Sequence, residues 1–396
     1  MLHPVLSLGA MPLANALLDP DDLGRAEPTY PLDLAFCPRC TLVQITETVP
    51  PDVLFREYLY FSSFSDTMLD HAKTLVDRLM ATRGLDGRSL VIEIGSNDGY
   101  LLQYFAARGI PVLGIEPAEN VAAVANSRGI ATRSEFFGRD LARTLRSEGY
   151  VADVVLANNV LAHVSDLNGV VEGIGHLLKP GGVAVIEVPY LRDMIDRCEF
   201  DTIYHEHLCY FSVTALKRLF ERHDLILADV ERIPVHGGSL RLSVARAADA
   251  GVGTNVTKLL AEEATWGVAR AEAYAAFGRR AEEIKTTLVA LITMLKQRGC
   301  RVAAYGAAAK GTVLLNYCRI GADVLDFVAD RSPYKQGRLV PGVRVPISPP
   351  SRLIEERPDY TLLLSWNLAD EVLQQQAEYR RLGGQFIVPI PDVRIV

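Results

Sequence analysis

Short apolar runs alternate with amphipathic stretches between residues 89 and 189. The runs are typical of strands, and the stretches between them have the apolar spacing of helices. Because polar residues do not interrupt the runs at every second position, both faces of each strand should be buried, as in a parallel sheet covered by helices. The expected strands lie in residues 89–96, 111–117, 152–159 and 181–189.

The same alternation returns toward the carboxyl end of the chain. A helical stretch at 255–298 comes first, with Gly299 as its stop signal. Strand and helix patterns then follow in residues 300–318, 323–330, 360–367 and 385–392. The pattern predicts a second doubly wound unit and a pocket between the two units.

The chain before residue 80 is irregular, with frequent prolines, a Cys-Pro-Arg-Cys sequence and a group of aromatic residues. It indicates a small accessory unit or lid. We therefore expect an α/β protein built from a small N-terminal lid unit (1–80), a central unit (81–250), a helical connection (251–298) and a C-terminal unit (299–396).

The charge balance argues against a nucleic-acid partner. The 396 residues include 41 Lys and Arg against 48 Asp and Glu, a net charge of −7, and phosphate neutralisation supplies most non-specific affinity for nucleic acids. No uncharged run is long enough to cross a bilayer. The six cysteines do not form a disulfide framework, which suits a reducing compartment. We expect a cytoplasmic enzyme that binds neither nucleic acid nor membrane; the sequence does not indicate its oligomeric state.

The first strand of the central unit ends in a turn suited to a nucleotide-like ligand. The turn leads into a helix, where backbone N–H groups meet such ligands, and Gly95 lets the chain approach closely. Asn97 stands at the second glycine position of the dinucleotide fingerprint. This departure counts against NAD and leaves room for a cofactor without a pyrophosphate, such as S-adenosylmethionine (SAM).

Further polar residues follow at the ends of the next strands. Glu116, after the second strand, is placed to accept hydrogen bonds from two ribose hydroxyls, although a solvated turn is the alternative. The third strand ends in two asparagines, with His163 soon after and Leu-Lys-Pro-Gly-Gly later. The ordered set resembles class I SAM-dependent methyltransferases, and this resemblance implies SAM contacts at Glu93, Gly95, Ser96, Asn97, Glu116, Asn158 and Asn159.

Two further motifs narrow the resemblance. Residues 204–212 read YHEHLCYFS and residues 236–241 read HGGSLR. Together with PLANALL, YPLDLAFCPRC, YLYFSSFS and YGAAAKG, they resemble the nucleotide-sugar C-methyltransferases that build branched deoxysugars in bacterial natural products. The resemblance runs essentially end to end. It implies a small zinc-binding N-terminal domain, a central SAM domain with a class I Rossmann-like fold, and a C-terminal Rossmann-like domain that holds the nucleotide.

The zinc element departs from the family pattern. The family uses two cysteine pairs, whereas this sequence contains one, Cys37 and Cys40. A closed structural zinc site needs four ligands, and His3 is a weak substitute for the missing pair. We therefore expect an incomplete site that holds less than one zinc per chain.

C-methylation requires a carbanion, and the accessible one is an enolate beside a ketone. A base must remove the α proton, and donors must stabilise the resulting oxyanion. We assign His207 as the base, Glu206 as its orienting or proton-relay partner, and Tyr204 as the donor to the substrate oxygen. His163 is a second candidate base. A purely structural role is the alternative, but several titratable side chains are costly to bury without a purpose.

The second unit should hold the nucleotide. The sequence Tyr-Gly-Ala-Ala-Ala-Lys-Gly again joins a strand to a helix, but its spacing is not that of a Walker A loop. Glycines at a helix start with one lysine suit a diphosphate. Tyr58 and Tyr60 either close over the substrate or pack the lid. The expected substrate contacts are Tyr58, Tyr60, Ser239, Arg241, Lys310, Asp330 and Lys335.

The sequence thus predicts methyl transfer from SAM to a carbon beside the keto group, with C3 preferred, of a dTDP-4-keto-deoxysugar. A sugar O-methyltransferase would share every SAM residue and is the nearest alternative. A SAM-binding protein without catalysis is a second one, against which the YHEH sequence argues. An NAD oxidoreductase that uses the C-terminal unit is a third, although YGAAAKG lacks the full fingerprint.

Overall fold

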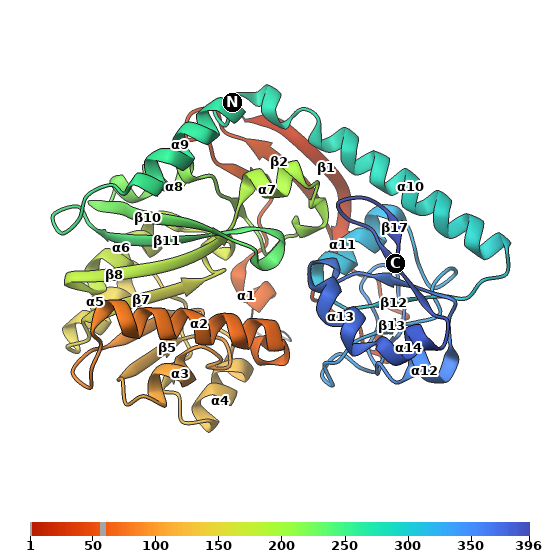
Figure 1. Cartoon of the computed structure of the whole chain (residues 1–396), viewed down its shortest axis with the longest axis horizontal. Coiled ribbons are helices and arrows are strands. Elements are labelled where there is room, and N and C mark those ends of the chain that lie inside the picture. Colours follow the sequence, from red (N-terminus) through yellow and green to blue (C-terminus); the bar gives the residue numbers. More distant parts are fainter. Residues whose placement is uncertain (1, 56–60) are drawn as a thin grey trace.

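The computed structural model describes residues 2–55 and 61–396, and it confirms the predicted α/β class. In these residues the strands form three sheets. Figure 1 shows two lobes, the central unit and the C-terminal unit, below an upper layer formed by the N-terminal strands and the long helix α10. Both expected doubly wound units are present.

The N-terminal sheet is antiparallel and takes its last strand from the central part of the chain. Its order is β1-β2-β3-β9. Residues of β3 pair with β9, which directly follows the YHEH motif. The motif therefore lies where the N-terminal and central units meet. The elements are β1 (His3–Pro12), β2 (Thr29–Phe36), β3 (Val43–Ile45), β9 (Cys209–Tyr210) and the short helix α1 (Pro51–Phe55).

The central sheet has seven strands in the order β10-β11-β8-β7-β4-β5-β6. The strands from β8 to β6 run parallel, and β11 is inserted antiparallel between β8 and β10. The strands are β4 (Val91–Ile94), β5 (Val112–Ile115), β6 (Thr132–Arg133), β7 (Ala152–Asn158), β8 (Leu178–Pro189), β10 (Leu225–Ile233) and β11 (Ser239–Arg246). The helices are α2 (Asp66–Arg83), α3 (Leu102–Ala106), α4 (Glu119–Ser127), α5 (Arg139–Ser147), α6 (Leu167–Leu177), α7 (Leu191–Asp196) and α8 (Val213–Glu221).

Helix α2 belongs to the core of the central unit. The hydroxyl of Ser65 caps its start by accepting from the Met68 N–H at 3.3 Å, and Gly84 ends it in a left-handed conformation. Its apolar face, including Ala72 and Leu75, packs with strands β4, β7 and β8. The boundary expected at residue 80 therefore cuts through a helix of the central unit.

The C-terminal unit contains the second sheet of doubly wound type. Its order is β14-β13-β12-β15-β16-β17, parallel except for β17. The elements are β12 (Val302–Tyr305), α11 (Ala309–Cys318), β13 (Val328–Ala329), β14 (Ile347–Ser348), α12 (Arg352–Glu356), β15 (Tyr360–Leu363), α13 (Ala369–Gln375), α14 (Ala377–Arg381), β16 (Gln385–Val388) and β17 (Arg394–Ile395). Helices α9 (Thr254–Trp266) and α10 (Phe277–Gln297) form the predicted connection.

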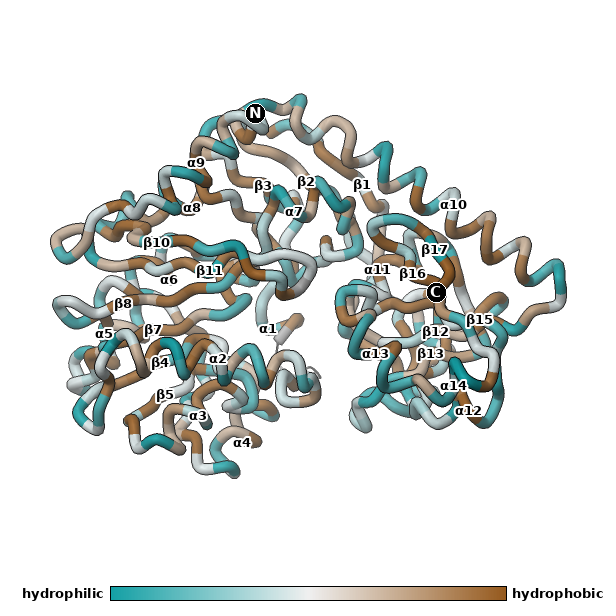
Figure 2. The backbone as a smooth tube through the Cα atoms, in the orientation of Figure 1, coloured by the Kyte–Doolittle hydropathy of each residue, from teal (hydrophilic) through white to brown (hydrophobic). Residues whose placement is uncertain are grey.

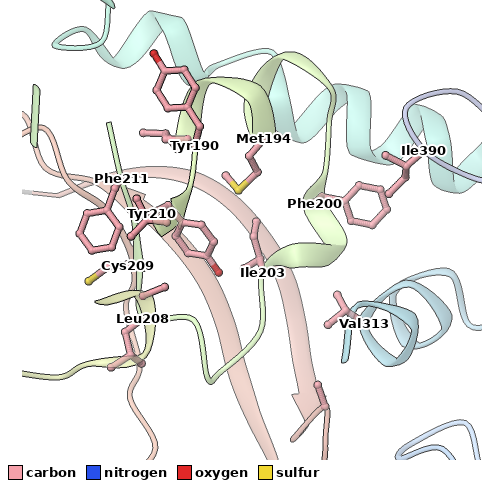
Figure 3. Close-up of a cluster of buried hydrophobic side chains, with 14 of the residues drawn as sticks. Tyr190, Met194, Phe200, Ile203, Leu208, Cys209, Tyr210, Phe211, Val313 and Ile390 are labelled. Atoms are coloured by element: carbon pink, nitrogen blue, oxygen red, sulfur yellow. The ribbon is translucent and has the colours of Figure 1, made fainter. Parts of the chain in front are cut away.

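One hydrophobic core runs through all three units. Hydrophobic residues concentrate in the inner strands of both lobes (Figure 2). At the junction of the lobes, Phe200 points toward Ile390 of the C-terminal unit (Figure 3), and the centroid of its ring lies 5.2 Å from that of Tyr317. This packing fixes the two lobes against each other. Among the described helices, none combines the length and the apolar character needed to span a membrane.

Candidate active site

A cavity of about 830 Å³ lies between the central and C-terminal units. Its walls come from the carboxyl ends of β4, β5 and β7 on one side and of β12 and β13 on the other, with residues 61–71 along one edge. Carboxyl ends of parallel strands are where doubly wound sheets bind ligands. Tyr58 and Tyr60 lie outside the described residues, so their expected role in closing this cavity stays a prediction.

The turn after β4 requires glycine at position 95, because of both its backbone conformation and its packing against Val160. Gly95 has a φ of +64°, and a Cβ at this position would lie 2.5 Å from Cγ2 of Val160. Asn97 is also left-handed, with a φ of +49°, a conformation that asparagine tolerates. Its side-chain oxygen accepts from the N–H of Ser62 at 2.8 Å. The residue that departs from the dinucleotide fingerprint thus anchors the N-terminal segment to this turn.

Glu116 lies at the tip of β5, as predicted. Its two carboxylate oxygens accept from the N–H groups of Asn97 and Ala118, each at 3.0 Å. Burial raises the pKa of Glu116, and these backbone donors offset part of the rise. Each oxygen keeps a second lone pair for a ligand hydroxyl.

Glu93 is a buried acid near the end of β4. Neither of its carboxylate oxygens has a hydrogen-bond partner among the described residues. Burial, followed by the nearby charges of Glu116, Asp98 and Glu187, raises the pKa of Glu93 well above its usual value. A buried acid in acidic surroundings suits a cationic ligand. Other polar atoms in this region that lack partners among the described residues are Oγ of Ser96 and the side-chain oxygens of Asn158 and Asn159.

These residues fit SAM, which carries a sulfonium and an ammonium group beside a ribose. Glu116 would accept from the ribose hydroxyls, and the acidic surroundings would favour the positive charge of the ligand. Glu93 and Ser96 do not themselves line the cavity. The predicted SAM residues lie together at the carboxyl ends of β4, β5 and β7.

Tyr204 and His207 form a hydrogen-bonded pair on the cavity wall. The phenol oxygen of Tyr204 lies 2.8 Å from Nε2 of His207, and Nδ1 of His207 lies 3.0 Å from the carbonyl oxygen of Thr202. A carbonyl can only accept, so the proton of the neutral ring is assigned to Nδ1. Nε2 then accepts from Tyr204 and is the basic nitrogen.

His163 lies against the same ring, with its centroid 4.7 Å from that of His207. Burial lowers the pKa of His163 to about 4, with a partly opposing hydrogen bond to the backbone of Glu206. A histidine with this pKa is neutral and weakly basic near pH 7. It lines the cavity as a neutral ring.

Glu206 was expected to orient His207, but the structure gives that position to the Thr202 carbonyl. The carboxylate of Glu206 accepts instead from the side-chain N–H₂ of Asn15, at 2.7 and 2.9 Å. It therefore ties the YHEH motif to the N-terminal unit. His205 is also structural, since its Nε2 lies 3.2 Å from the Pro31 carbonyl.

In the C-terminal unit, Asp330 repeats the geometry of Glu116. Its carboxylate accepts from the N–H groups of Ala307 at 2.7 Å and Ser332 at 2.8 Å. Lys335 donates to the Ala307 carbonyl at 2.8 Å and lies 4.0 Å from Asp330. Asp330 and Lys335 both line the cavity. Their contact with a nucleotide stays a prediction.

Lys310 also lines the cavity, but it turns toward the central unit. Its Nζ donates to Oδ1 of Asn367 at 2.9 Å and lies 4.6 Å from the centre of the Trp366 ring. Its charge interacts with Asp201 and Glu199. These two acids and Trp366 were not predicted as site residues, because lone acids and a lone tryptophan carry no recognisable spacing.

The prediction that Ser239 and Arg241 contact the substrate is not supported by their positions. Ser239 donates to the Val235 carbonyl at 2.9 Å, and Nε of Arg241 donates to Glu187 at 2.7 Å. Neither residue lines the cavity. The sheet register causes this, because Arg241 lies opposite Glu187 in the pairing of β11 with β8. Glu187 also pairs with His71 of α2 at 2.8 Å, and this histidine, absent from the predicted set, lines the cavity.

The cysteine pair does not complete a metal site. His3 lies opposite Phe36 in the β1–β2 pairing. Phe36 is the residue directly before Cys37 in the sequence. Within residues 2–55 and 61–396, no group of three or more His, Cys, Asp or Glu side chains could hold a metal ion. All six cysteines, which fall within this range, are free thiols. The residues present therefore do not fit a closed zinc site.

The strand order and the cofactor-side residues together define a class I SAM-dependent methyltransferase. Three family models match the chain along its length: one described as a putative zinc binding domain at residues 1–55, one as a methyltransferase domain at 67–229, and one as a C-methyltransferase C-terminal domain at 234–391.

A relative covers almost the whole chain. The chain is 39% identical over 393 residues to the C-methyltransferase NovU of Streptomyces niveus, covering 99% of this chain and 94% of that protein. The chain therefore belongs to the family of SAM-dependent C-methyltransferases, as its motifs predict.

Other relatives match smaller parts. A ubiquinone biosynthesis O-methyltransferase of Azorhizobium caulinodans is 29% identical over 119 residues, which are 28% of this chain and 47% of that protein. Among solved structures, the PH0226 protein of Pyrococcus horikoshii aligns with a TM-score of 0.39 and 17% identity, over 47% of this chain and 94% of that one.

Proposed function

We propose that the chain transfers the methyl group of SAM to a carbon beside the keto group of a nucleotide-linked deoxysugar, a dTDP-4-keto sugar with C3 as the acceptor. Membership of the C-methyltransferase family supports reaction at carbon. The Tyr204–His207 pair, in a cavity bordered by both expected ligand sites, is the observation that carries the proposal. A cytoplasmic location stays a prediction.

Bound SAM supplies the electrophilic methyl group, and the chain must supply the carbon nucleophile. Nε2 of His207 accepts the α proton of the keto sugar, while the Thr202 carbonyl holds the Nδ1–H and thus the tautomer. The low pKa of His163 favours His207 over it as the base. His163 then serves as a neutral ring that limits water around His207.

Tyr204 completes the proton transfer. Nε2 has one lone pair, so the Tyr204 O–H must turn from Nε2 to the ketone oxygen as the α proton approaches. The phenol O–H then donates to the enolate oxygen that forms, the role expected for it from the sequence, and the protonated Nε2 donates to the phenol oxygen. Proton capture and oxyanion stabilisation are thereby coupled in one pair of side chains.

The C-terminal unit supports the nucleotide part of the proposal. In the proposed complex Asp330, held by the Ala307 N–H, accepts from ribose hydroxyls, and the loop after β12 together with Lys335 binds the diphosphate. Lys310 is the remaining cation on this side of the cavity that we assigned to the substrate.

The experiment that tests the proposed reaction is product analysis after incubation with SAM and a panel of dTDP-4-keto-deoxysugars. We expect a new C–CH₃ group at C3, identified by carbon–proton correlation in NMR spectra. C5 flanks the same ketone, so a methyl group at C5 would keep the enolate mechanism and correct the position. A methyl group on oxygen would support the O-methyltransferase alternative and overturn the proposal.

A further inference from the structure

The junction between the two lobes contains buried ionisable groups to which the proposed mechanism gives no specific substrate contact. Glu199 is 3% exposed and Asp201 is fully buried. Asp201 lies in the 3-10 turn Phe200–Thr202, which Glu199 directly precedes. Lys310, on α11, faces them from the C-terminal unit. Of these groups, Glu199 and Lys310 line the cavity, whereas Asp201 accepts from the indole N–H of Trp366 at 2.7 Å.

Glu199 is a buried acid with unused hydrogen-bonding capacity. Its Oε1 has no hydrogen-bond partner among the described residues. The backbone of Gly237, from the HGGSLR motif, lies so close that a Cβ there would be 2.5 Å from either carboxylate oxygen. The glycine therefore holds the carboxyl group in place without satisfying it. A buried polar atom in this state on a cavity wall can bond to an ordered water or to a ligand group that takes the place of that water.

Lys310 supplies the complementary donor. An ammonium group carries three N–H donors, and Asn367 accepts one of them. Its charge interacts with that of Glu199 across the junction, yet its described hydrogen bond goes to Asn367 rather than to the acid. A donor and an acceptor that face one cavity without pairing leave a place for a group that is both.

We propose that Glu199 and Lys310 form a subsite for a hydroxyl group of the sugar ring. Lys310 donates to the hydroxyl oxygen, and Glu199 accepts the hydroxyl hydrogen. The inference rests on the proposed function, because it takes the ligand between the His207 side and the nucleotide side of the cavity to be the sugar.

Two other ligand groups fit the subsite less well. A phosphate would be repelled by Asp201, whose carboxyl group is largely ionised near pH 7 although burial raises its pKa to about 6, so the diphosphate is better placed near Lys335. An ammonium would be repelled by Lys310. Burial raises the pKa of Glu199 to about 8, so near neutral pH its carboxyl group is largely protonated and does little to offset that repulsion. A neutral hydroxyl group meets neither penalty.

The subsite is also connected to the base. The N–H of Thr202 donates to the Glu199 carbonyl at 3.1 Å, and the Thr202 hydroxyl donates to the same carbonyl at 2.7 Å. The Thr202 carbonyl in turn holds Nδ1 of His207. A hydroxyl group gripped at Glu199 would therefore place the sugar in a fixed position relative to Nε2.

Pairs of sugar nucleotides that differ at one ring position test the proposal. For one hydroxy–deoxy pair, the intact protein should show kcat/KM higher for the hydroxy substrate by roughly 10- to 100-fold, the worth of a hydrogen-bonded pair of buried groups. Glu199→Met, which keeps the length of the side chain and removes the acceptor, should reduce this ratio toward one while leaving SAM affinity unchanged. If the variant lowered kcat/KM equally for both members of every pair, Glu199 would have a structural role and the proposal would be overturned.

Lys310→Met should change kcat/KM in opposite directions for two substrates. It keeps the length of the side chain and removes the charge, so kcat/KM should fall with the hydroxy substrate and rise with the amino sugar that replaces that hydroxyl. A uniform fall with both would contradict the subsite.

Binding separates this inference from the proposed reaction. Calorimetry with dTDP-glucose, which has no keto group, and with its deoxy analogue measures the subsite without turnover. A preference for the hydroxy ligand that Glu199→Met removes would uphold the subsite even if no methylated product formed. If C-methylation were observed without any such preference, the subsite would be wrong and the proposed function would stand.

Discussion

The two doubly wound units use one backbone arrangement in opposite electrostatic settings. In each, a carboxylate after the second strand accepts from an N–H of the loop after the first strand and from the N–H two residues further on: Glu116 in the central unit and Asp330 in the C-terminal unit. Around Glu116 the nearby charges include further acids, among them Glu93. Beside Asp330 stands Lys335.

The difference indicates which ligand each unit receives. An acidic surface suits the sulfonium and ammonium groups of SAM, whereas a lysine near a glycine loop suits a diphosphate. The shared carboxylate serves the ribose that both ligands contain. The fold thus provides the ribose contact, and the neighbouring charges select the rest of the molecule.

Among the substitutions that test this comparison, we expect the largest effect on ligand binding from a change of Glu116. Glu116→Ala should weaken SAM binding by about 1.5–3 kcal/mol, because hydrogen bonds to a charged group are lost. Nucleotide-sugar binding, measured in the same calorimeter, should not change. Unchanged SAM affinity would remove the cofactor site from the central unit.

The reciprocal change, Asp330→Ala, should have a smaller effect, about 0.5–1.5 kcal/mol on nucleotide-sugar binding, because Asp330 is more exposed than Glu116. SAM affinity is its control. If either variant weakened the other unit's ligand to the same extent, the assignment of one ligand to each unit would fail.

The burial of Glu93, together with the acids near it, predicts a pH-dependent effect on stability. A carboxyl group whose folded-state pKa is raised binds its proton more tightly when folded, so the free energy of unfolding falls as pH rises above the unfolded pKa, about 4.3, toward the folded value. Glu93→Gln should therefore flatten the dependence between pH 5 and 8 in the absence of SAM. Urea unfolding at several pH values measures it, and parallel curves for the two proteins would show that Glu93 is not the cause.

The smallest effect concerns zinc. Because Cys37 and Cys40 supply half of a tetrahedral shell, the chain of 396 residues should hold less than one zinc, and a chelator should leave its melting temperature nearly unchanged. Elemental analysis that found one tightly bound zinc per chain would reveal ligands outside the described groups.

The positions of residues that depend on a short stretch of sequence could be predicted. The glycine turn after β4 and the acids after β5 and β13 follow from strand-end motifs, which place Gly95, Glu116 and Asp330 without knowledge of the whole fold. Tyr204 and His207 are three residues apart, so their contact also follows from a short motif.

Residues whose roles depend on distant pairing were not predictable. Asn15 binds Glu206 across 191 residues, and Trp366 binds Asp201 across 165. Arg241 was wrongly assigned to the substrate because strand register, set by long-range packing, directs it to Glu187.

Hydrogen exchange at carbon tests the central claim most directly. In deuterated water, without SAM or with its demethylated product bound, the protein should exchange the proton α to the ketone of a dTDP-4-keto-deoxysugar. His207→Asn should slow this exchange and methylation by about 10²–10⁴-fold, the usual contribution of a positioned base, whereas His163→Asn should retain exchange. Exchange that survives in His207→Asn but is lost in His163→Asn would move the base to His163. Absence of enzyme-dependent exchange, together with a methyl group on oxygen, would contradict the enolate mechanism.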